Sequence, residues 1–290
     1  MDTITRKAYA KINLGLDVIR RREDGYHEVK MIMQSIGLYD TLTFHKKGEP
    51  GITLVTNKEE LLGDENNLVY KAAKLLVDNY SIKEGVYITL EKRIPMAAGM
   101  AGGSTDAAAV FHGMNELFSL GLTIDELCAL AVRIGADVPY CIQGGTALAE
   151  GIGEKLKQLP GMPDCFLLIA KPDIDVSTKF VYENLHADYL TDHPDIHGMI
   201  DALEAEDLDG IAARIENVLE TVTVKEYPQV DKIKQFMNAN GAMGALMSGS
   251  GPTVFGIYST QERAQKAKEG LTKEGLAKEV YVTVPVNNRD

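Results

Sequence analysis

A glycine-rich stretch in the first half of the chain has the composition of an anion-binding loop. Residues 95–106 read Pro-Met-Ala-Ala-Gly-Met-Ala-Gly-Gly-Ser-Thr-Asp and lead into an alanine-rich segment that favours a helix. Gly99, Gly102 and Gly103 allow backbone conformations that turn several N–H groups toward one point. The helix that follows adds unpaired N–H donors and a partial positive charge, so the stretch predicts a phosphate-binding site.

This loop differs from the two common nucleotide-binding motifs. The chain contains neither the pattern G-x-x-x-x-G-K-[ST] nor the pattern G-x-G-x-x-G. Because the formal charge is −12, a phosphorylated ligand must be held by local donors against a repulsive background. The alternative interpretation is a glycine turn that only starts a helix.

A second glycine-rich turn lies near the C-terminus. Residues 247–253 read Met-Ser-Gly-Ser-Gly-Pro-Thr and separate two expected strands. Such a run of small residues indicates a close approach of the backbone to a ligand or to another loop, through Gly249 and Ser250. The alternative is a tight hairpin with no ligand.

The elements that would position these loops alternate between strands and helices. The first 55 residues read as strands because their apolar residues alternate. Asn67 and the Thr123–Glu126 pair are expected to cap helices. Further helices are predicted at 104–118, 195–203, 207–220 and 228–240. Pro160, Gly161 and Pro163 mark a domain boundary, which divides the chain into residues 1–160 and 161–290.

Composition limits the class of protein. A length of 290 residues with 45% hydrophobic and 25% charged residues is typical of a soluble globular protein, and no apolar run is long enough to span a membrane. The polar N-terminus lacks a signal-peptide core, so we expect a cytoplasmic protein. Three cysteines at 128, 141 and 165 predict no disulfide framework. The acidic balance argues against nucleic-acid binding.

Three motifs appear in the order typical of the GHMP kinase superfamily, which includes galactokinase, homoserine kinase and mevalonate kinase. They are Lys11-Ile12-Asn13-Leu14, the 95–106 loop, and Gly249-Ser250-Gly251-Pro252-Thr253. The chain resembles most closely those members that phosphorylate one hydroxyl of a cytidine-diphosphate-linked polyol in the non-mevalonate route to isoprenoid precursors. The segments that carry this narrower resemblance are 10–14, Asp24-Gly25-Tyr26-His27, 135–139, 149–154 and 247–251.

This resemblance implies an α/β (α+β) fold with an N-terminal mixed sheet and a C-terminal ferredoxin-like domain. It implies ATP and Mg²⁺ as cofactors, a small-molecule acceptor as partner, and a monomer or homodimer. No metal ligand can be assigned from the sequence. The residues expected to wrap the ATP phosphates are Pro95, Met96, Ala97, Ala98, Gly99, Met100, Ala101, Gly102, Gly103, Ser104 and Thr105.

The resemblance also assigns roles to two charged residues. Phosphoryl transfer needs a base within reach of the attacking hydroxyl, and Asp137, held by Pro139, is the candidate. Lys11 lies in an otherwise apolar strand, where an unpaired charge is costly, and is implied to pair with Asp137. The alternatives are a solvent-exposed carboxylate for Asp137 and an edge-strand charge for Lys11.

The remaining candidates would bind the acceptor. Asn13 faces the same way as Lys11, because alternate residues of a strand share a face. The resemblance places Tyr26, His27 and Tyr182 around the cytosine ring, and the alternative for the two tyrosines is ordinary packing. Two rivals stay open: a smaller acceptor such as mevalonate, homoserine or a sugar, and a ligand-binding regulator without turnover.

Overall fold

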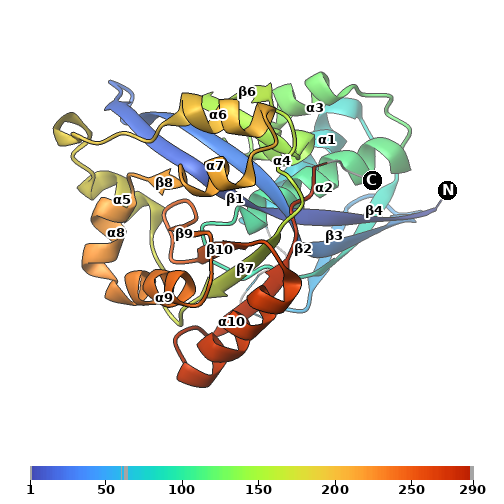
Figure 1. Cartoon of the computed structure of the whole chain (residues 1–290). Helices are drawn as coiled ribbons and strands as arrows, with labels where there is room; N and C mark the ends of the chain where they lie inside the picture. The colour runs from blue at the N-terminus through green and yellow to red at the C-terminus, as the bar shows by residue number, and fades with distance from the viewer. Residues whose placement is uncertain (1, 60, 62–64, 288–290) are drawn as a thin grey trace. The chain divides into compact units, whose positions relative to one another are not determined.

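A computed structural model describes residues 2–59, 61 and 65–287 (Figure 1). The described chain divides into two compact units. The first contains the residues up to Ala10, Leu38–Ile94 and Ala101–Gln143, and the second contains Lys11–Gly37, Pro95–Met100 and the chain from Gly144 onward. The strands β1 (Thr3–Arg21) and β2 (His27–Lys47) run through both units, so each unit uses one part of each strand.

The first unit combines a mixed sheet with four helices. Its strand order is β3-β4-β2-β1, in which β3 (Ile52–Thr56) is parallel to β4 (Gly85–Glu91) and β4 is antiparallel to β2. Helices α1 (Leu68–Tyr80) and α2 (Gly102–Leu117) pack on each other, and α3 (Ile124–Ala131) and α4 (Val138–Gln143) follow them. Five consecutive residues, 107–111, are buried in α2, so it is a core helix.

The second unit contains a further group of strands and a separate antiparallel sheet. Strand β2 pairs with β5 (Thr146–Gly151), β5 pairs with β6 (Lys155–Gln158), and β1 pairs in parallel with β8 (Glu216–Asn217). The antiparallel sheet has the order β11-β7-β10-β9, made of β7 (Phe166–Lys171), β9 (Gly244–Met247), β10 (Val254–Tyr258) and β11 (Glu279–Thr283).

Helices α9 (Pro228–Ala239) and α10 (Gln261–Glu274) pack against this antiparallel sheet. The succession β7, α9, β9, β10, α10, β11 with this strand order is the ferredoxin-like β-α-β-β-α-β arrangement. The other helices of this unit are α5 (Thr178–Asn184), the short 3₁₀ helix η1 (Ala187–Tyr189), α6 (Ile196–Glu204), α7 (Leu208–Ala212) and α8 (Glu220–Glu226). The expected fold class is therefore confirmed.

Local sequence signals explain several helix starts. The Asn67 side chain accepts the N–H of Val69 at the start of α1, and Thr123 forms a capping box with Glu126 at the start of α3. Pro228 occupies the first turn of α9, where its missing N–H costs nothing. These capping predictions are confirmed.

Two local predictions are wrong. The helix expected over 207–220 is instead α7, the short strand β8 and the start of α8, because Glu216 and Asn217 pair with β1. The segment around Pro139 was expected to leave helical geometry, yet α4 begins at Val138. Proline is tolerated there because the first turn of a helix needs no N–H donor.

Candidate active site

The glycine loop has an unusual backbone at alternate positions. Ala97, Gly99 and Ala101 have φ values of 48°, 69° and 55°, all in the left-handed region. Alanine pays about 1–2 kcal/mol for this conformation, and such strain gathers at functional sites. Alternation of right-handed and left-handed residues turns successive N–H groups to one side and forms a concave anion site. The backbone thus has the form expected of a phosphate loop.

Gly99 is the point where the glycine loop meets the second glycine turn. A Cβ at Gly99 would lie 2.2 Å from the carbonyl oxygen of Ser248, so no larger residue fits. The Ser248 hydroxyl donates to the Gly99 carbonyl at 3.0 Å. A Cβ at Gly249 would in turn lie 3.0 Å from the Gly99 oxygen. The two glycine segments, more than a hundred residues apart in sequence, are therefore in contact.

Lys11 joins this contact from strand β1. Its Nζ donates to Asn13 Oδ1 at 2.6 Å and to the Gly99 carbonyl at 3.1 Å, and its main-chain N–H donates to the Met100 carbonyl at 3.2 Å. Both Lys11 and Asn13 are buried. The ammonium group is thus held by two neutral oxygen atoms, and the structure brings together Lys11, Asn13, Gly99 and Gly249.

Neutral side chains support the second glycine turn from behind. Asn217 Nδ2 donates to the carbonyls of Met247 and Gly249 at 2.9 and 2.8 Å, while its Oδ1 accepts the N–H of Leu219 at 3.0 Å. The Thr223 hydroxyl donates to the Ser250 carbonyl at 3.1 Å. Asn217 satisfies the turn with an amide, and so its position depends on no charge.

The expected base-binding residues divide into two groups. The rings of His27 and Tyr182 lie 5.2 Å apart at an interplanar angle of 39°, so these two side chains are in contact. Burial and the neighbouring charge of Arg21 lower the pKa of His27, which favours the neutral imidazole. Tyr26 is 61% exposed. An exposed tyrosine beside a histidine–tyrosine pair offers an aromatic face, and its binding role stays a prediction.

Asp137 belongs to the first unit, whereas Lys11 belongs to the second. Asp137 is half-buried and directly precedes α4, where its carbonyl accepts the N–H of Cys141 at 3.0 Å. The carboxylate therefore sits on a short helix start held by Pro139. The pairing of Asp137 with Lys11, and its part in proton transfer, stay predictions.

The two hydroxyls at the start of α2 differ in environment. The Thr105 hydroxyl is buried and donates to the Tyr9 carbonyl at 2.7 Å, which ties α2 to strand β1. Ser104 is partly exposed. Of the two, Ser104 is the one that can reach a ligand without losing an internal hydrogen bond.

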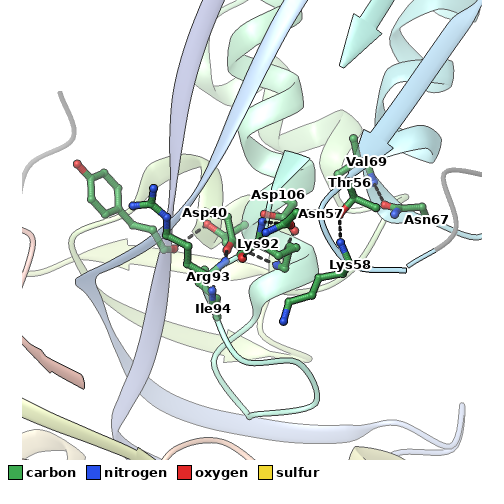
Figure 2. A network of polar contacts seen from close by, with 12 residues as sticks. Asp40, Thr56, Asn57, Lys58, Asn67, Val69, Lys92, Arg93, Ile94 and Asp106 are labelled. Atoms are coloured by element: carbon green, nitrogen blue, oxygen red, sulfur yellow. Dashed lines mark hydrogen bonds and ion pairs between the residues drawn. The ribbon is translucent and has the colours of Figure 1, made fainter. Parts of the chain in front are cut away.

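A buried ionic cluster lies beneath the glycine loop, and the sequence did not predict it (Figure 2). Lys92 Nζ contacts Asp40 Oδ2 and, at 2.7 Å, Asp106 Oδ2. The main-chain N–H groups of Arg93 and Ile94 both donate to Asp40 Oδ1. Burial lowers the pKa of Lys92, but attraction to Asp106 and Asp40 outweighs it and leaves that pKa raised, so Lys92 is charged. A signal was present, since Asp106 interrupts an apolar helix.

Figure 2 also shows how this cluster connects to neighbouring segments. Asn57 Oδ1 accepts the main-chain N–H of Lys92 at 2.8 Å, and Asn57 Nδ2 donates to the Lys92 carbonyl at 3.2 Å. The Asn57 side chain thereby fixes the backbone at the end of β4, next to the residues that lead into the glycine loop.

Within residues 2–59, 61 and 65–287, no group of three or more His, Cys, Asp and Glu side chains could hold a metal ion. In the same part of the chain, no helix is long and apolar enough to cross a membrane. All three cysteines are thiols, as expected.

Sequence profiles match both halves of the chain. The profile for the GHMP kinases N terminal domain matches residues 67–145, and the profile for GHMP kinases C terminal matches residues 199–277. The 4-diphosphocytidyl-2-C-methyl-D-erythritol kinase of Lachnoclostridium phytofermentans is 55% identical over 283 residues, which is 98% of this chain and 97% of the relative. The protein of that name from Clostridium perfringens is 47% identical and covers 98% of this chain and 99% of its own.

Solved structures agree with these relatives. A crystal structure of 4-(cytidine 5'-diphospho)-2C-methyl-D-erythritol kinase has a TM-score of 0.85 at 33% identity and covers 98% of this chain and 100% of its own. Homoserine kinase from Cytophaga hutchinsonii has a TM-score of 0.81 at 21% identity, with 100% and 96% covered, and shows the shared fold alone. With near-complete coverage at this identity, the chain belongs to the family of 4-diphosphocytidyl-2-C-methyl-D-erythritol kinases, within the GHMP kinases.

Proposed function

We propose that this protein transfers the γ-phosphoryl group of ATP to the 2-hydroxyl of 4-diphosphocytidyl-2-C-methyl-D-erythritol. The observation that carries the proposal is the hydrogen-bonded cluster of Lys11, Asn13 and Gly99. It links the polar face of strand β1 directly to the glycine loop. A hydroxyl bound beside Lys11 would thus lie next to the segment that holds the transferred phosphate.

Each part of the reaction has a candidate residue. As the oxygen of the acceptor forms a bond to the γ-phosphorus, the bond from that phosphorus to the bridging oxygen of ADP breaks. Asp137 takes the proton of the attacking hydroxyl. Lys11 stabilises the negative charge that develops on the same oxygen. Asn13 and the Gly99 carbonyl keep the ammonium group in place, because they occupy two of its donors.

The glycine loop is proposed to hold the ATP phosphates with main-chain N–H groups from Pro95–Thr105. The left-handed residues at 97, 99 and 101 support this, since they shape a concave donor surface. We propose that Mg²⁺ is held mainly by the phosphates of ATP, with the Ser104 hydroxyl as the candidate protein ligand. Mg²⁺ supplies neutralisation of phosphate charge when it is bound.

The cytidine part of the acceptor is assigned to Tyr26, His27 and Tyr182, and the second glycine turn contributes Gly249 and Ser250. The contact of His27 with Tyr182 supports a shared aromatic wall. A neutral imidazole both donates and accepts hydrogen bonds, which suits the edge of a cytosine ring. We also propose a cytoplasmic monomer or homodimer without nucleic-acid or membrane partners, to be checked by light scattering.

The reaction is tested by measuring ATP-dependent phosphorylation of 4-diphosphocytidyl-2-C-methyl-D-erythritol in the presence of Mg²⁺, beside mevalonate, homoserine and galactose. Selective turnover of the cytidylated polyol is the expected result. Turnover of one of the other acceptors instead would contradict the assigned cytidine pocket. ATP binding without transfer to any acceptor would favour a regulator.

The role of Asp137 is tested by Asp137→Asn. We expect kcat to fall by about 10²–10⁴-fold, the usual contribution of a positioned base, while the Kd for ATP stays near the wild-type value. Asp125→Asn, an exposed carboxylate in the first turn of α3, is the matched control and should keep full activity. Normal turnover by Asp137→Asn would remove it from the mechanism.

A further inference from the structure

The buried cluster of Asp40, Lys92 and Asp106 has no part in the proposed chemistry, yet it touches both ends of the glycine loop. Asp40 accepts the N–H groups of Arg93 and Ile94, which directly precede the loop. Asp106 lies near the start of α2, which directly follows the loop. Lys92 binds both carboxylates and so connects the two ends (Figure 2).

The cluster also touches the first residue of α2. A Cβ at Gly102 would lie 3.2 Å from Lys92 Nζ and 3.3 Å from Ile94 Cγ2, which is tight. The loop therefore closes over the cluster, and a change in the position of Lys92 would be felt at its exit. Because all three ionisable side chains are at most 5% exposed, water cannot replace their contacts.

The two carboxylates are not equivalent. Asp40 has both oxygen atoms occupied, one by Lys92 and the other by two main-chain donors. Asp106 uses only Oδ2, and its buried Oδ1 has no hydrogen-bond partner among the described residues. A second buried negative charge with one oxygen unpaired would be costly.

The direction of the Asp106 pKa agrees with this difference. Burial raises that pKa well above its ordinary value, and the neighbouring Asp40 adds to the increase, whereas the charge of Lys92 acts the other way. One ammonium group is balanced by one carboxylate, and the second carboxyl group is the one that holds its proton.

We propose that Asp40, Lys92 and Asp106 form a positioning staple that sets the two ends of the glycine loop for ATP, with Asp40 as the charged member and Asp106 as an uncharged acceptor. An uncharged Asp106 adds no negative charge near the start of α2, where the phosphates are expected to bind. This inference rests on the proposed function in one respect, namely that the glycine loop holds the phosphates.

The test compares two substitutions of equal size and equal change in side-chain type. Asp106→Asn keeps an oxygen acceptor for Lys92, so its Kd for ATP should stay within about threefold of the wild-type value. Asp40→Asn leaves the charge of Lys92 unbalanced and should weaken ATP binding by at least about tenfold, equal to about 1.4 kcal/mol. Asp78→Asn, exposed and four residues from Lys74, is the surface control and should change nothing.

Binding is measured by calorimetry with ATP and Mg²⁺ and without any acceptor. The result is therefore independent of which acceptor the enzyme uses, and failure of the proposed reaction would be visible separately in the turnover assay. For folded variants, kinetics should show the Asp40→Asn effect in the KM for ATP more than in the KM for the acceptor. A merely structural role would lower the active fraction and leave both KM values unchanged.

A second measurement covers the case in which Asp40→Asn does not fold. The infrared spectrum of the wild-type protein at neutral pH should contain the C=O band of a protonated carboxyl group. This band should vanish in Asp106→Asn and persist in Asp78→Asn. Absence of the band in the wild type, or equal weakening of ATP binding by the folded Asp40→Asn and Asp106→Asn variants, would overturn the proposal.

Discussion

The first glycine loop is anchored at its ends by charged side chains, whereas the second glycine turn is anchored by neutral ones. Beneath the first, Lys92 lies between Asp40 and Asp106. Behind the second, the Asn217 amide makes three hydrogen bonds, to Met247, Gly249 and Leu219. Both anchors are buried and both hold backbone next to the Gly99 contact, so they solve the same problem with different chemistry.

The difference has energetic consequences. A buried ion pair gains strong attraction but requires full balance, because removal of one partner leaves the other charged and unsolvated. An amide needs only its hydrogen bonds, and losing them costs less. The ionic anchor should therefore be stiff and intolerant, and the neutral anchor more forgiving. Substitutions at the two anchors can establish or refute this contrast.

The largest effect is expected for Asp40→Ala. Truncation strands the charge of Lys92 and frees the N–H groups of Arg93 and Ile94, so the free energy of unfolding should fall by about 3–5 kcal/mol. Urea denaturation measures this loss. Asp78→Ala on the surface of α1 should stay within about 0.5 kcal/mol of the wild type. An equal, small loss in both variants would mean that the ionic anchor carries no special weight.

A smaller effect is expected for Asn217→Ala. The substitution leaves the buried carbonyls of Met247 and Gly249 without their shared donor, which should lower the free energy of unfolding by about 1–3 kcal/mol. The same denaturation experiment compares it with Asn238→Ala, an exposed position on α9. If Asn217→Ala costs as much as Asp40→Ala, the distinction between neutral and charged anchors is lost.

The smallest effect is expected from pH alone, because no atom is removed and Lys92 stays beside Asp106. The native pKa of Asp106 is raised, so the native state binds its proton more tightly than the unfolded state does. The resulting stability is present below the ordinary value of 3.8 and is lost as pH rises through the raised pKa. The stability of the wild type relative to Asp106→Asn should thus decrease with pH.

Denaturation midpoints of both proteins over a pH series measure this difference. Asn217→Ala supplies the contrast, since an amide does not titrate and its stability deficit should be constant. A difference between wild type and Asp106→Asn that does not change with pH would argue against a proton on Asp106.

Much of the site was predictable because it depends on local residue types. Glycines at 99 and 249 identify both turns, and Lys11 is conspicuous in an apolar strand. The left-handed conformations of Ala97 and Ala101 were not predictable, because alanine carries no signal for positive φ. Asp106 in an apolar helix was a signal, but its partners Asp40 and Lys92 lie 66 and 14 residues away, as the hydrogen-bonded positions 40, 92 and 106 show.

The sequence alone determined the class of fold, the family resemblance, the helix caps and the two glycine turns, since these depend on composition, spacing and local hydrogen bonds. Only the tertiary structure decided which turn touches which strand, which carboxylate is balanced by Lys92, and why residues 216–217 form a strand within an expected helix. Such features arise from contacts between distant segments, where burial removes water and makes each polar group depend on the partner that folding supplies.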